Sequence, residues 1–181
     1  MEARDMSRRE FLGGMAAAAI GTGLGITQDA EARSRRRAKR PKQNTVARII
    51  FAETNGASDF ERQLVASVMR NRVGNPAFGN LRSMDAVVRQ HNAFEALGDK
   101  DNANWARSAN PGKLAGDSKR AWEQSVQLAS DAKPAAGPSG RLIVYYHDKS
   151  ISKPKGWDNK SWHAVKEIET PKLIFYSIVK S

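Results

Sequence analysis

The sequence contains no cysteine, so the fold has to hold together without disulfide bonds. It is also poor in acidic residues, with 19 Asp and Glu against 30 Lys and Arg, which leaves a net charge of +11. No apolar run approaches the roughly 20 residues that a membrane-spanning helix needs. The 181 residues are nevertheless enough for one domain with a sizeable core and some appended segments.

Several catalytic signatures are missing as well. The three histidines, His91, His147 and His163, show no metal-ligand spacing, and there is no H-E-x-x-H motif. A zinc-dependent amidase is therefore disfavoured, and we expect neither a metal nor another cofactor. No serine lies in a G-x-S-x-G motif, which argues against a serine hydrolase of that type.

The first 32 residues resemble a bacterial twin-arginine export signal. Residues 7–12 read SRREFL, a small and mildly apolar run extends from Gly13 to Ile26, and residues 30–32 form an A-x-A cleavage pattern. An uncleaved membrane anchor is the alternative, but the run is short and rich in Gly and Ala. We therefore expect a signal peptide at 1–32 and export to the periplasm, the cell envelope or the medium.

A basic segment follows at residues 33–43. Seven of the ten residues from Arg33 to Lys42 are basic and none is a large apolar residue, so we expect a solvated, disordered linker. Residues 44–181 hold 20 basic and 14 acidic residues, a surplus of +6. This balance favours anionic partners such as wall polymers or a membrane surface. Export and the lack of a binding motif argue against a specific nucleic acid, and we expect a monomer.

Helices are predicted first along residues 44–181. One should begin near Thr45 and end before Gly56. A capping box, S-x-x-E from Ser58 to Glu61, should begin the next, whose predicted buried side consists of Phe60, Leu64, Val65 and Val68. Ser83 can cap a short helix to Gln90, and Asp117 can cap a longer helix with a stripe of Trp122, Val126 and Ala129. Residues 92–116 are polar and predicted to be irregular.

Strands are predicted near the end of the chain. Residues 142–146 and 173–176 are rich in β-branched and aromatic side chains, and a loop with Pro154 and Gly156 separates them. Helices followed by strands predict a single α+β domain with a small C-terminal antiparallel sheet.

Glu53 is out of place in the first predicted helix. It shares one helical face with Val46, Ile49 and Ile50, where an ionised carboxylate is costly unless it is paired. One explanation is a glutamate at the last helical turn that bends outward to solvent or pairs with an arginine such as Arg48 or Arg62. The other is a carboxylic acid held in a partly apolar cleft, with its pKa raised so that it can serve as a general acid.

The segment around Glu53 resembles the SleB-type cell-wall hydrolases, also called spore-cortex-lytic enzymes. The similarity begins with ARIIFAETNGASDFERQLVASVMRNRV at residues 47–73 and continues in HNAFEAL, Trp105, YYHDKSISKPKGW and LIFYSI. It implies a lysozyme-like domain acting on the glycan strands of peptidoglycan, with Glu53 as the catalytic acid. It further implies a lytic transglycosylase, which cleaves between N-acetylmuramic acid and N-acetylglucosamine.

The resemblance also implies a substrate site. It places Tyr146 and His147 near the sugar, with Phe94 and Glu95 in the cleft and Trp157 able to stack on a sugar ring. Tyr145 is expected to pack in the core, as are Trp105, Trp122 and Trp162. The chain departs from its relatives after Glu53, where it reads TNGA in place of an acidic partner, and at residues 93–95, where it reads AFE in place of QFS.

Two alternatives follow from these departures. The domain could be a wall-binding module of the same fold without turnover. It could also be a hydrolytic muramidase or glucosaminidase, which needs a second carboxylate; Asp59, Glu95 and Asp148 are the candidates. Glu61 is better explained as the reciprocal half of the capping box.

Overall fold

The computed structural model describes residues 44–181 except 91–92, 99–100 and 159–160, and the side chain of Glu95 lies outside this description. The predicted signal peptide and basic linker, residues 1–43, lie outside this range. The helices are α2 (Thr45–Thr54), α3 (Asp59–Arg72), α4 (Met84–Val88), α5 (Glu95–Gly98), α6 (Ala103–Ser108) and α7 (Gly116–Asp131). The strands are β1 (Tyr145–Asp148), β2 (Trp162–Glu169) and β3 (Leu173–Lys180), and short 3-10 turns are η1 (Pro76–Phe78), η2 (Pro111–Lys113) and η3 (Lys155–Trp157).

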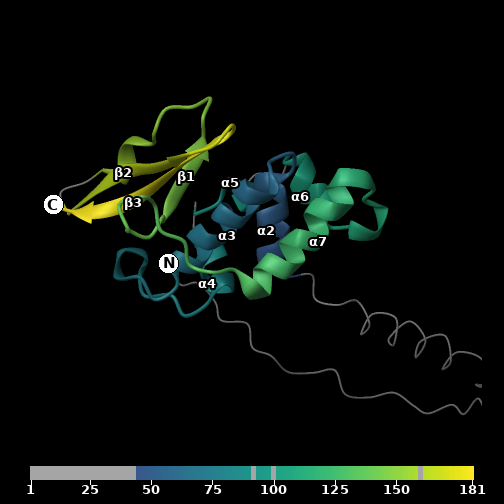
Figure 1. The fold of residues 1–181 in the computed structure, drawn as a ribbon. Coiled ribbons are helices and arrows are strands. Elements are labelled where there is room, and N and C mark those ends of the chain that lie inside the picture. Colours follow the sequence, from purple (N-terminus) through teal and green to yellow (C-terminus); the bar gives the residue numbers. More distant parts are fainter. Residues whose placement is uncertain (1–43, 91–92, 99–100, 159–160) are drawn as a thin grey trace, which may run out of the picture. The chain divides into compact units, whose positions relative to one another are not determined.

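Helix α2 is the central helix of the domain. The side chain of Asn44 caps it by accepting from the N–H of Val46 at 3.0 Å. Most of its residues are buried, including Ile49 and Phe51, because α3, α4, α5, α6 and α7 all pack against it. Figure 1 shows it among the other helices, with the strands gathered on the other side of the domain. The last turn of α2 is thereby fixed from several directions.

Helix α3 begins with the predicted capping box. The N–H of Ser58 donates to Glu61 at 2.8 Å, and the Ser58 hydroxyl accepts from the Glu61 N–H at 3.2 Å. The prediction that Phe60 is buried is wrong, since 57% of it is exposed. The buried stripe runs through Glu61, Val65 and Val68, at spacings of four and three, and Phe60 lies about 100° away from Glu61 around the helix.

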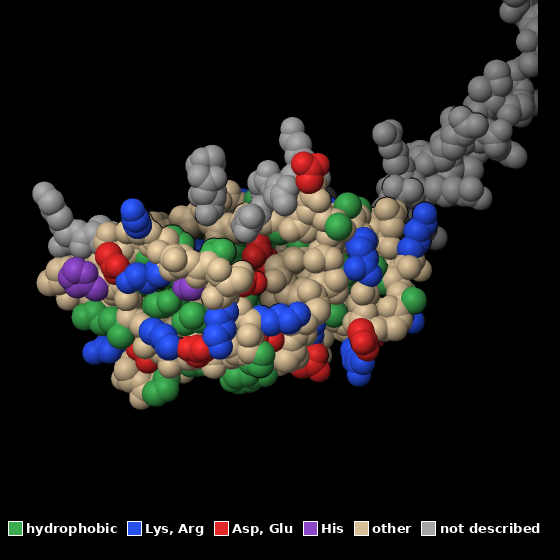
Figure 2. Space-filling view, turned by 90° about the horizontal axis from the view of Figure 1, so that it is seen from above, with side chains coloured by type: hydrophobic (Ala, Val, Ile, Leu, Met, Phe, Trp, Pro, Cys, Tyr) green, Lys and Arg blue, Asp and Glu red, His purple; other side chains and the backbone are tan. Residues whose placement is uncertain are grey.

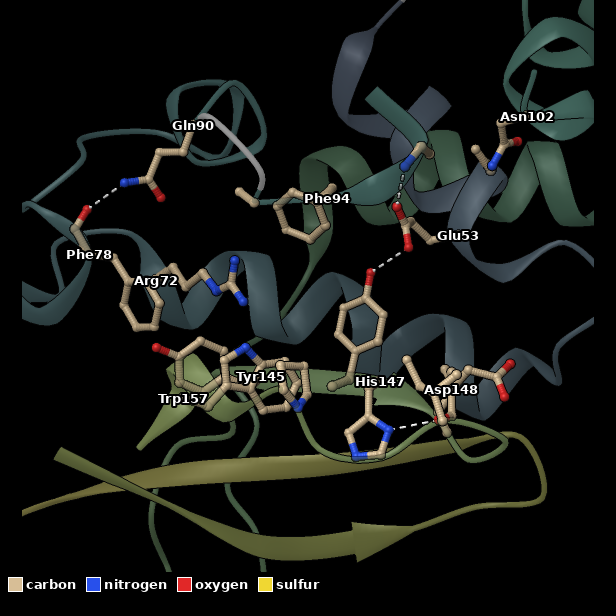
Figure 3. A pocket seen from close by; sticks show the side chains of 17 residues that line it. Glu53, Arg72, Phe78, Gln90, Phe94, Asn102, Tyr145, His147, Asp148 and Trp157 are labelled. Atoms are coloured by element: carbon tan, nitrogen blue, oxygen red, sulfur yellow. Dashed lines mark hydrogen bonds between the residues drawn. The ribbon is translucent and has the colours of Figure 1, made fainter. Parts of the chain in front are cut away.

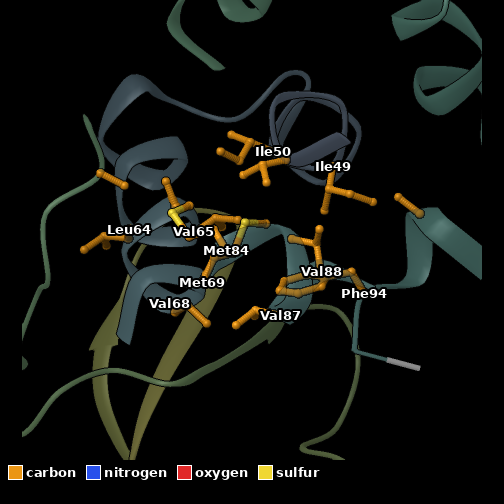
Figure 4. Close-up of a cluster of buried hydrophobic side chains, with 14 of the residues drawn as sticks. Ile49, Ile50, Leu64, Val65, Val68, Met69, Met84, Val87, Val88 and Phe94 are labelled. Atoms are coloured by element: carbon orange, nitrogen blue, oxygen red, sulfur yellow. The ribbon is translucent and has the colours of Figure 1, made fainter. Parts of the chain in front are cut away.

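The hydrophobic core lies between α2, α3 and α4. Ser83 caps α4 as predicted, by accepting from the N–H of Ala86 at 3.2 Å. Figure 4 shows the apolar side chains that these helices and the following segment direct toward one another. They are Ile49, Ile50, Leu64, Val65, Val68, Met69, Met84, Val87, Val88 and Phe94.

The prediction that residues 92–116 are irregular is wrong in part, because α5, α6 and η2 lie within this segment. Their short lengths and high Asn and Gly content hide the helical period. Asn102 caps α6 by accepting from the N–H of Trp105 at 2.8 Å. Arg48 then donates to the Trp105 carbonyl at 3.1 Å, which ties α6 to α2.

Helix α7 begins at Gly116, one residue before Asp117, which was predicted to cap it. Ala115 is the N-cap and makes no side-chain hydrogen bond, so Asp117 lies in the first turn and does not cap the helix. Val126, predicted to lie on the buried stripe, is 43% exposed. Ala121 and Ser125 are buried instead, and their small side chains allow α7 to approach α2.

The sheet is antiparallel with the order β1-β3-β2. His147 pairs with Ile174 in the first ladder, and Val165 pairs with Ser177 in the second, with a bulge between Lys166 and Ile168. The predicted strand at 142–146 is shifted, since β1 starts at Tyr145 and Leu142 forms only an isolated bridge. Strand β2 was not predicted, because WHAVKEIE carries four charged or His residues. The α+β class with a small C-terminal antiparallel sheet is confirmed.

Helix α3 connects the helical part to the sheet at both of its ends. At its start, Glu61 accepts from the Thr170 hydroxyl at 2.6 Å and from the Lys172 N–H at 2.9 Å. At its end, Asn71 donates to the Ile143 carbonyl at 2.7 Å and Arg72 donates to the Val144 carbonyl at 2.8 Å. These bonds fix β1 relative to α2 and α3, and so determine the space between them.

Figure 2 shows Lys and Arg side chains scattered over one face, with Asp and Glu side chains among them. Within the described residues, no helix combines the length and the apolar character that crossing a membrane requires.

Candidate active site

A cleft of about 870 Å³ opens between the helices and the sheet. Its walls come from the end of α2, the end of α3, the segment around α5, strand β1 and the turn η3 (Figure 3). The lining residues are Ala52, Glu53, Arg72, Phe78, Gln90, Ala93, Phe94, Ala96, Asn102, Tyr145, Tyr146, His147, Asp148, Ile151, Pro154, Trp157 and Leu173.

Glu53 lies in the last turn of α2 and is partly exposed to this cleft. One carboxylate oxygen accepts from the backbone N–H of Ala96 at 2.9 Å, and the other accepts from the Tyr146 hydroxyl at 3.0 Å (Figure 3). Both oxygens are therefore oriented by neighbours from other elements. A carboxylate held in a fixed geometry at a cleft wall is what proton transfer requires.

The two arginines considered as ion-pair partners of Glu53 are engaged elsewhere. The guanidinium carbon of Arg48 lies 3.6 Å from the centroid of the Trp105 ring, and its Nε donates to Ser108 at 2.9 Å. Arg62 forms an ion pair with Asp59 at 2.8 Å. The ion-pair explanation with these two residues is therefore wrong.

Tyr146 is held by apolar packing. Its ring lies 6.5 Å from that of Phe94 and 5.9 Å from that of Phe175, measured between ring centroids. Phe94 is only 5% exposed and Phe175 is fully buried. The hydroxyl that reaches Glu53 is thus placed by the aromatic core beneath it.

His147 uses both ring nitrogens inside the protein. Nδ1 lies 2.7 Å from the Asp148 carbonyl oxygen and Nε2 lies 2.9 Å from the Tyr176 hydroxyl. A carbonyl can only accept, so Nδ1 donates to Asp148, and Nε2 is hydrogen-bonded to the Tyr176 hydroxyl. The ring is 7% exposed and both of its nitrogens are hydrogen-bonded within the protein, so His147 supports the cleft wall.

Trp157 and Tyr145 form an aromatic wall. Their rings stack with centroids 4.6 Å apart and an interplanar angle of 16°. Both residues are partly exposed and line the cleft, so the expectation that Tyr145 packs in the core is wrong. Burial raises the pKa of Tyr145, and the nearby Arg72 opposes the shift. A flat aromatic surface of this kind suits the apolar face of a sugar ring.

Arg72 was not predicted as a site residue. It is 6% exposed, and its guanidinium carbon lies 4.8, 5.2 and 5.3 Å from the ring centroids of Phe78, Phe94 and Tyr145. Burial lowers its pKa, opposed by Tyr146, Tyr145 and Glu53. The sequence held one signal for the burial of Arg72, which lies four residues after Val68 and therefore on the same buried face of α3.

The remaining acidic candidates differ in their positions. Asp59 is exposed, pairs with Arg62 and does not line the cleft. Glu95 begins α5, but its side chain is outside the described part of the chain. Asp148 is exposed and lines the cleft, and hydrogen bonds from Ser150 lower its pKa. Glu61 is the predicted reciprocal half of the capping box.

The site thus consists of a carboxylate held at the wall of an aromatic-lined cleft, between a helical part and a small sheet. Residues 56–176, well over half of the chain, match the family model described as Cell Wall Hydrolase. The chain belongs to the cell wall hydrolase family, which supports a peptidoglycan hydrolase. No curated protein and no solved structure matches it. The match includes Arg72, Tyr146 and Trp157 and begins after Glu53.

Proposed function

We propose that this protein is an exported, SleB-type peptidoglycan-degrading enzyme with a lysozyme-like domain. It cleaves the glycan strand between N-acetylmuramic acid and N-acetylglucosamine, with Glu53 as the acid and base. The observation that carries the proposal is the geometry of Glu53, whose two carboxylate oxygens are held by Ala96 and Tyr146 at the wall of the cleft.

The proposed reaction is that of a lytic transglycosylase. The Glu53 carboxylic acid donates its proton to the glycosidic oxygen, and the bond from that oxygen to C1 of the muramic acid breaks. The Glu53 carboxylate then takes the proton of the C6 hydroxyl of the same sugar, whose oxygen bonds to C1 and closes a 1,6-anhydro ring. No water is consumed, so one carboxylate is sufficient and returns to its protonated form.

Hydrolysis is the second candidate, because Asp148 also lines the cleft. Its lowered pKa, caused by the hydrogen bonds from Ser150, would keep it ionised and able to activate a water. This reaction would leave a reducing end in place of the anhydro ring.

Digestion of purified cell wall followed by mass spectrometry of the products tests the proposal. We expect 1,6-anhydromuramic ends. Reducing muramic acid ends would indicate a muramidase, and reducing glucosamine ends would indicate a glucosaminidase. Binding to the wall without release of glycan fragments would indicate a non-catalytic wall-binding module and would contradict the proposal.

A further inference from the structure

Arg72 is a buried charge whose terminal nitrogens face the cleft. Its Nε donates to the Val144 carbonyl at 2.8 Å, and this is the hydrogen bond that it forms within the described residues. Within the described residues, the fully buried side-chain atoms without a hydrogen-bond partner are Arg62 Nε and Asn71 Oδ1. The two terminal nitrogens of Arg72 are not among them, so they keep some exposure, and Arg72 lines the cleft. They are therefore open to the cleft and available to a ligand.

The guanidinium is held rigidly. The Val144 carbonyl binds it from one side, and the rings of Phe78, Phe94 and Tyr145 surround it at 4.8 to 5.3 Å (Figure 3). A buried cation is costly unless an anion or fixed dipoles compensate it. Two parallel N–H donors in a fixed plane match the two oxygens of a carboxylate.

We propose that Arg72 binds a carboxylate of the substrate, and that this is the lactyl carboxylate of the muramic acid unit whose bond Glu53 breaks. The inference rests on the proposed function. The lactyl group is attached to C3 of the same ring whose C1 bond is cleaved, so its carboxylate lies within one sugar of the reacting atoms. Arg72 and Glu53 line the same cleft, close enough for the Glu53 charge to act on the guanidinium.

This assignment has a consequence for substrate preference. In peptidoglycan with intact stem peptides the lactyl carboxyl is an amide and carries no charge. It is a free carboxylate only in strands from which the peptide has been removed. The protein should therefore prefer peptide-free glycan strands, the product of an amidase reaction. Carboxylates of the stem peptide are the other source of the same chemistry, and they lie further from the cleaved bond.

A binding experiment separates these sources without requiring turnover. The full-length protein is titrated with N-acetylmuramic acid, with its lactyl carboxamide, and with N-acetylmuramic acid bearing a stem peptide, using calorimetry at neutral pH. We expect the free acid to bind about tenfold more tightly than the carboxamide, as a charge-assisted bidentate pair implies. The peptide-bearing ligand should bind no better than the carboxamide.

Three variants assign the effect to Arg72. Arg72→Gln should remove the preference for the free acid, and Arg72→Lys should keep part of it, because the charge remains and the fork is lost. Arg70→Gln removes the same charge from an exposed position of α3 and should keep the whole preference. If Arg72→Gln does not fold, Arg72→Lys and the three wild-type titrations still decide.

Equal affinity of the wild type for the acid and the carboxamide would overturn the inference. A preference that persists in Arg72→Gln would overturn it too, as would tighter binding of the peptide-bearing ligand. The proposed function can fail separately. If the protein binds the free acid through Arg72 but releases no glycan fragments, catalysis by Glu53 is refuted and the role of Arg72 in binding stands.

Discussion

The carboxylate of Glu53 is oriented by the Ala96 N–H and the Tyr146 hydroxyl. Both donors are neutral and come from other elements, so α5 and β1 must be docked against α2 before the acid has its working geometry. Phe94 and Phe175 fix the Tyr146 ring. The hydroxyl of Tyr146 can therefore be removed with little disturbance to the packing.

Tyr146→Phe should reduce wall cleavage by about 10- to 100-fold, because a hydrogen bond to a charged group contributes about 1.5–3 kcal/mol. The ring remains packed, so we expect the melting temperature to change little. Initial rates of glycan release and a thermal melt measure the two effects.

Tyr176→Phe is the matched control, since it removes a hydroxyl that binds His147 and not Glu53. It should lose less activity and more stability than Tyr146→Phe. The reverse order would show that the hydroxyl of Tyr146 does not serve Glu53.

At the scale of elements, the site depends on how α3 joins the helices to the sheet. Glu61 is 1% exposed and links the capping box to the turn between β2 and β3. Burial alone would raise the pKa of Glu61, but hydrogen bonds from Thr170, Ser58 and Lys172 outweigh it and lower the pKa to about 2. The folded state therefore binds this proton less readily than the unfolded state does.

Glu61 should make the domain sensitive to acid. A depressed pKa adds stability above the unfolded value of about 4.3, and this contribution is lost as the pH falls toward 2. The full contribution is about 3 kcal/mol. Urea unfolding at pH 7, 4 and 2.5 should show this loss in the wild type and a smaller one in Glu61→Gln, which should already be less stable at pH 7.

Glu123→Gln is the control for this series, because its exposed carboxylate lies 4.0 Å from Lys119 on the surface of α7. It should change stability by less than about 0.5 kcal/mol. A parallel loss of stability in wild type and Glu61→Gln across the same pH range would contradict the role of Glu61.

The elements that the sequence predicts correctly are those with local signals. The capping box of α3 and the cap of α4 depend on residues three apart, so they can be read directly. Strand β2 carries the exposed Lys166 next to Glu167, whose side chain is only 3% exposed, so charge does not mark its outer face. The short α5 and α6 have no repeated apolar face. The positions of these three elements depend on contacts with β3 and α2 that no local pattern contains.

The candidate site divides in the same way. Glu53 stands out because a carboxylate on an apolar face is unusual, and Phe94, Tyr146, His147 and Trp157 follow from the resemblance. Arg72 is hidden because an arginine near a helix end is ordinary in sequence. Its burial becomes visible only when Phe78 and Tyr145, distant in the chain, close around it.

At the scale of the whole molecule, we propose that the basic charge and the N-terminal segments determine where the enzyme works. We propose export by the twin-arginine pathway to the periplasm, envelope or medium. Replacing Arg8 and Arg9 with lysines should block export, because the signal is recognised through the arginine pair. Fractionation with an antibody to the domain measures it, and normal amounts of the variant outside the cytoplasm would contradict the signal peptide.

The basic segment at residues 33–43 should strengthen attachment to anionic wall polymers or membrane surfaces. Deleting residues 33–42 should weaken wall binding more at low salt than at high salt, because ions screen the attraction. The described domain begins after this segment, so its melting temperature should not change. Loss of folding on deletion would show that the segment belongs to the domain.

The central claim is that Glu53 transfers the proton, and Glu53→Gln tests it most directly. The amide keeps the shape of the side chain but cannot deliver or accept the proton, so we expect the rate of glycan release to fall about 100- to 10,000-fold. The melting temperature should stay the same or rise, because a charge leaves a largely apolar face of α2. A fully active Glu53→Gln protein, or one that loses stability and keeps its turnover, would contradict the account.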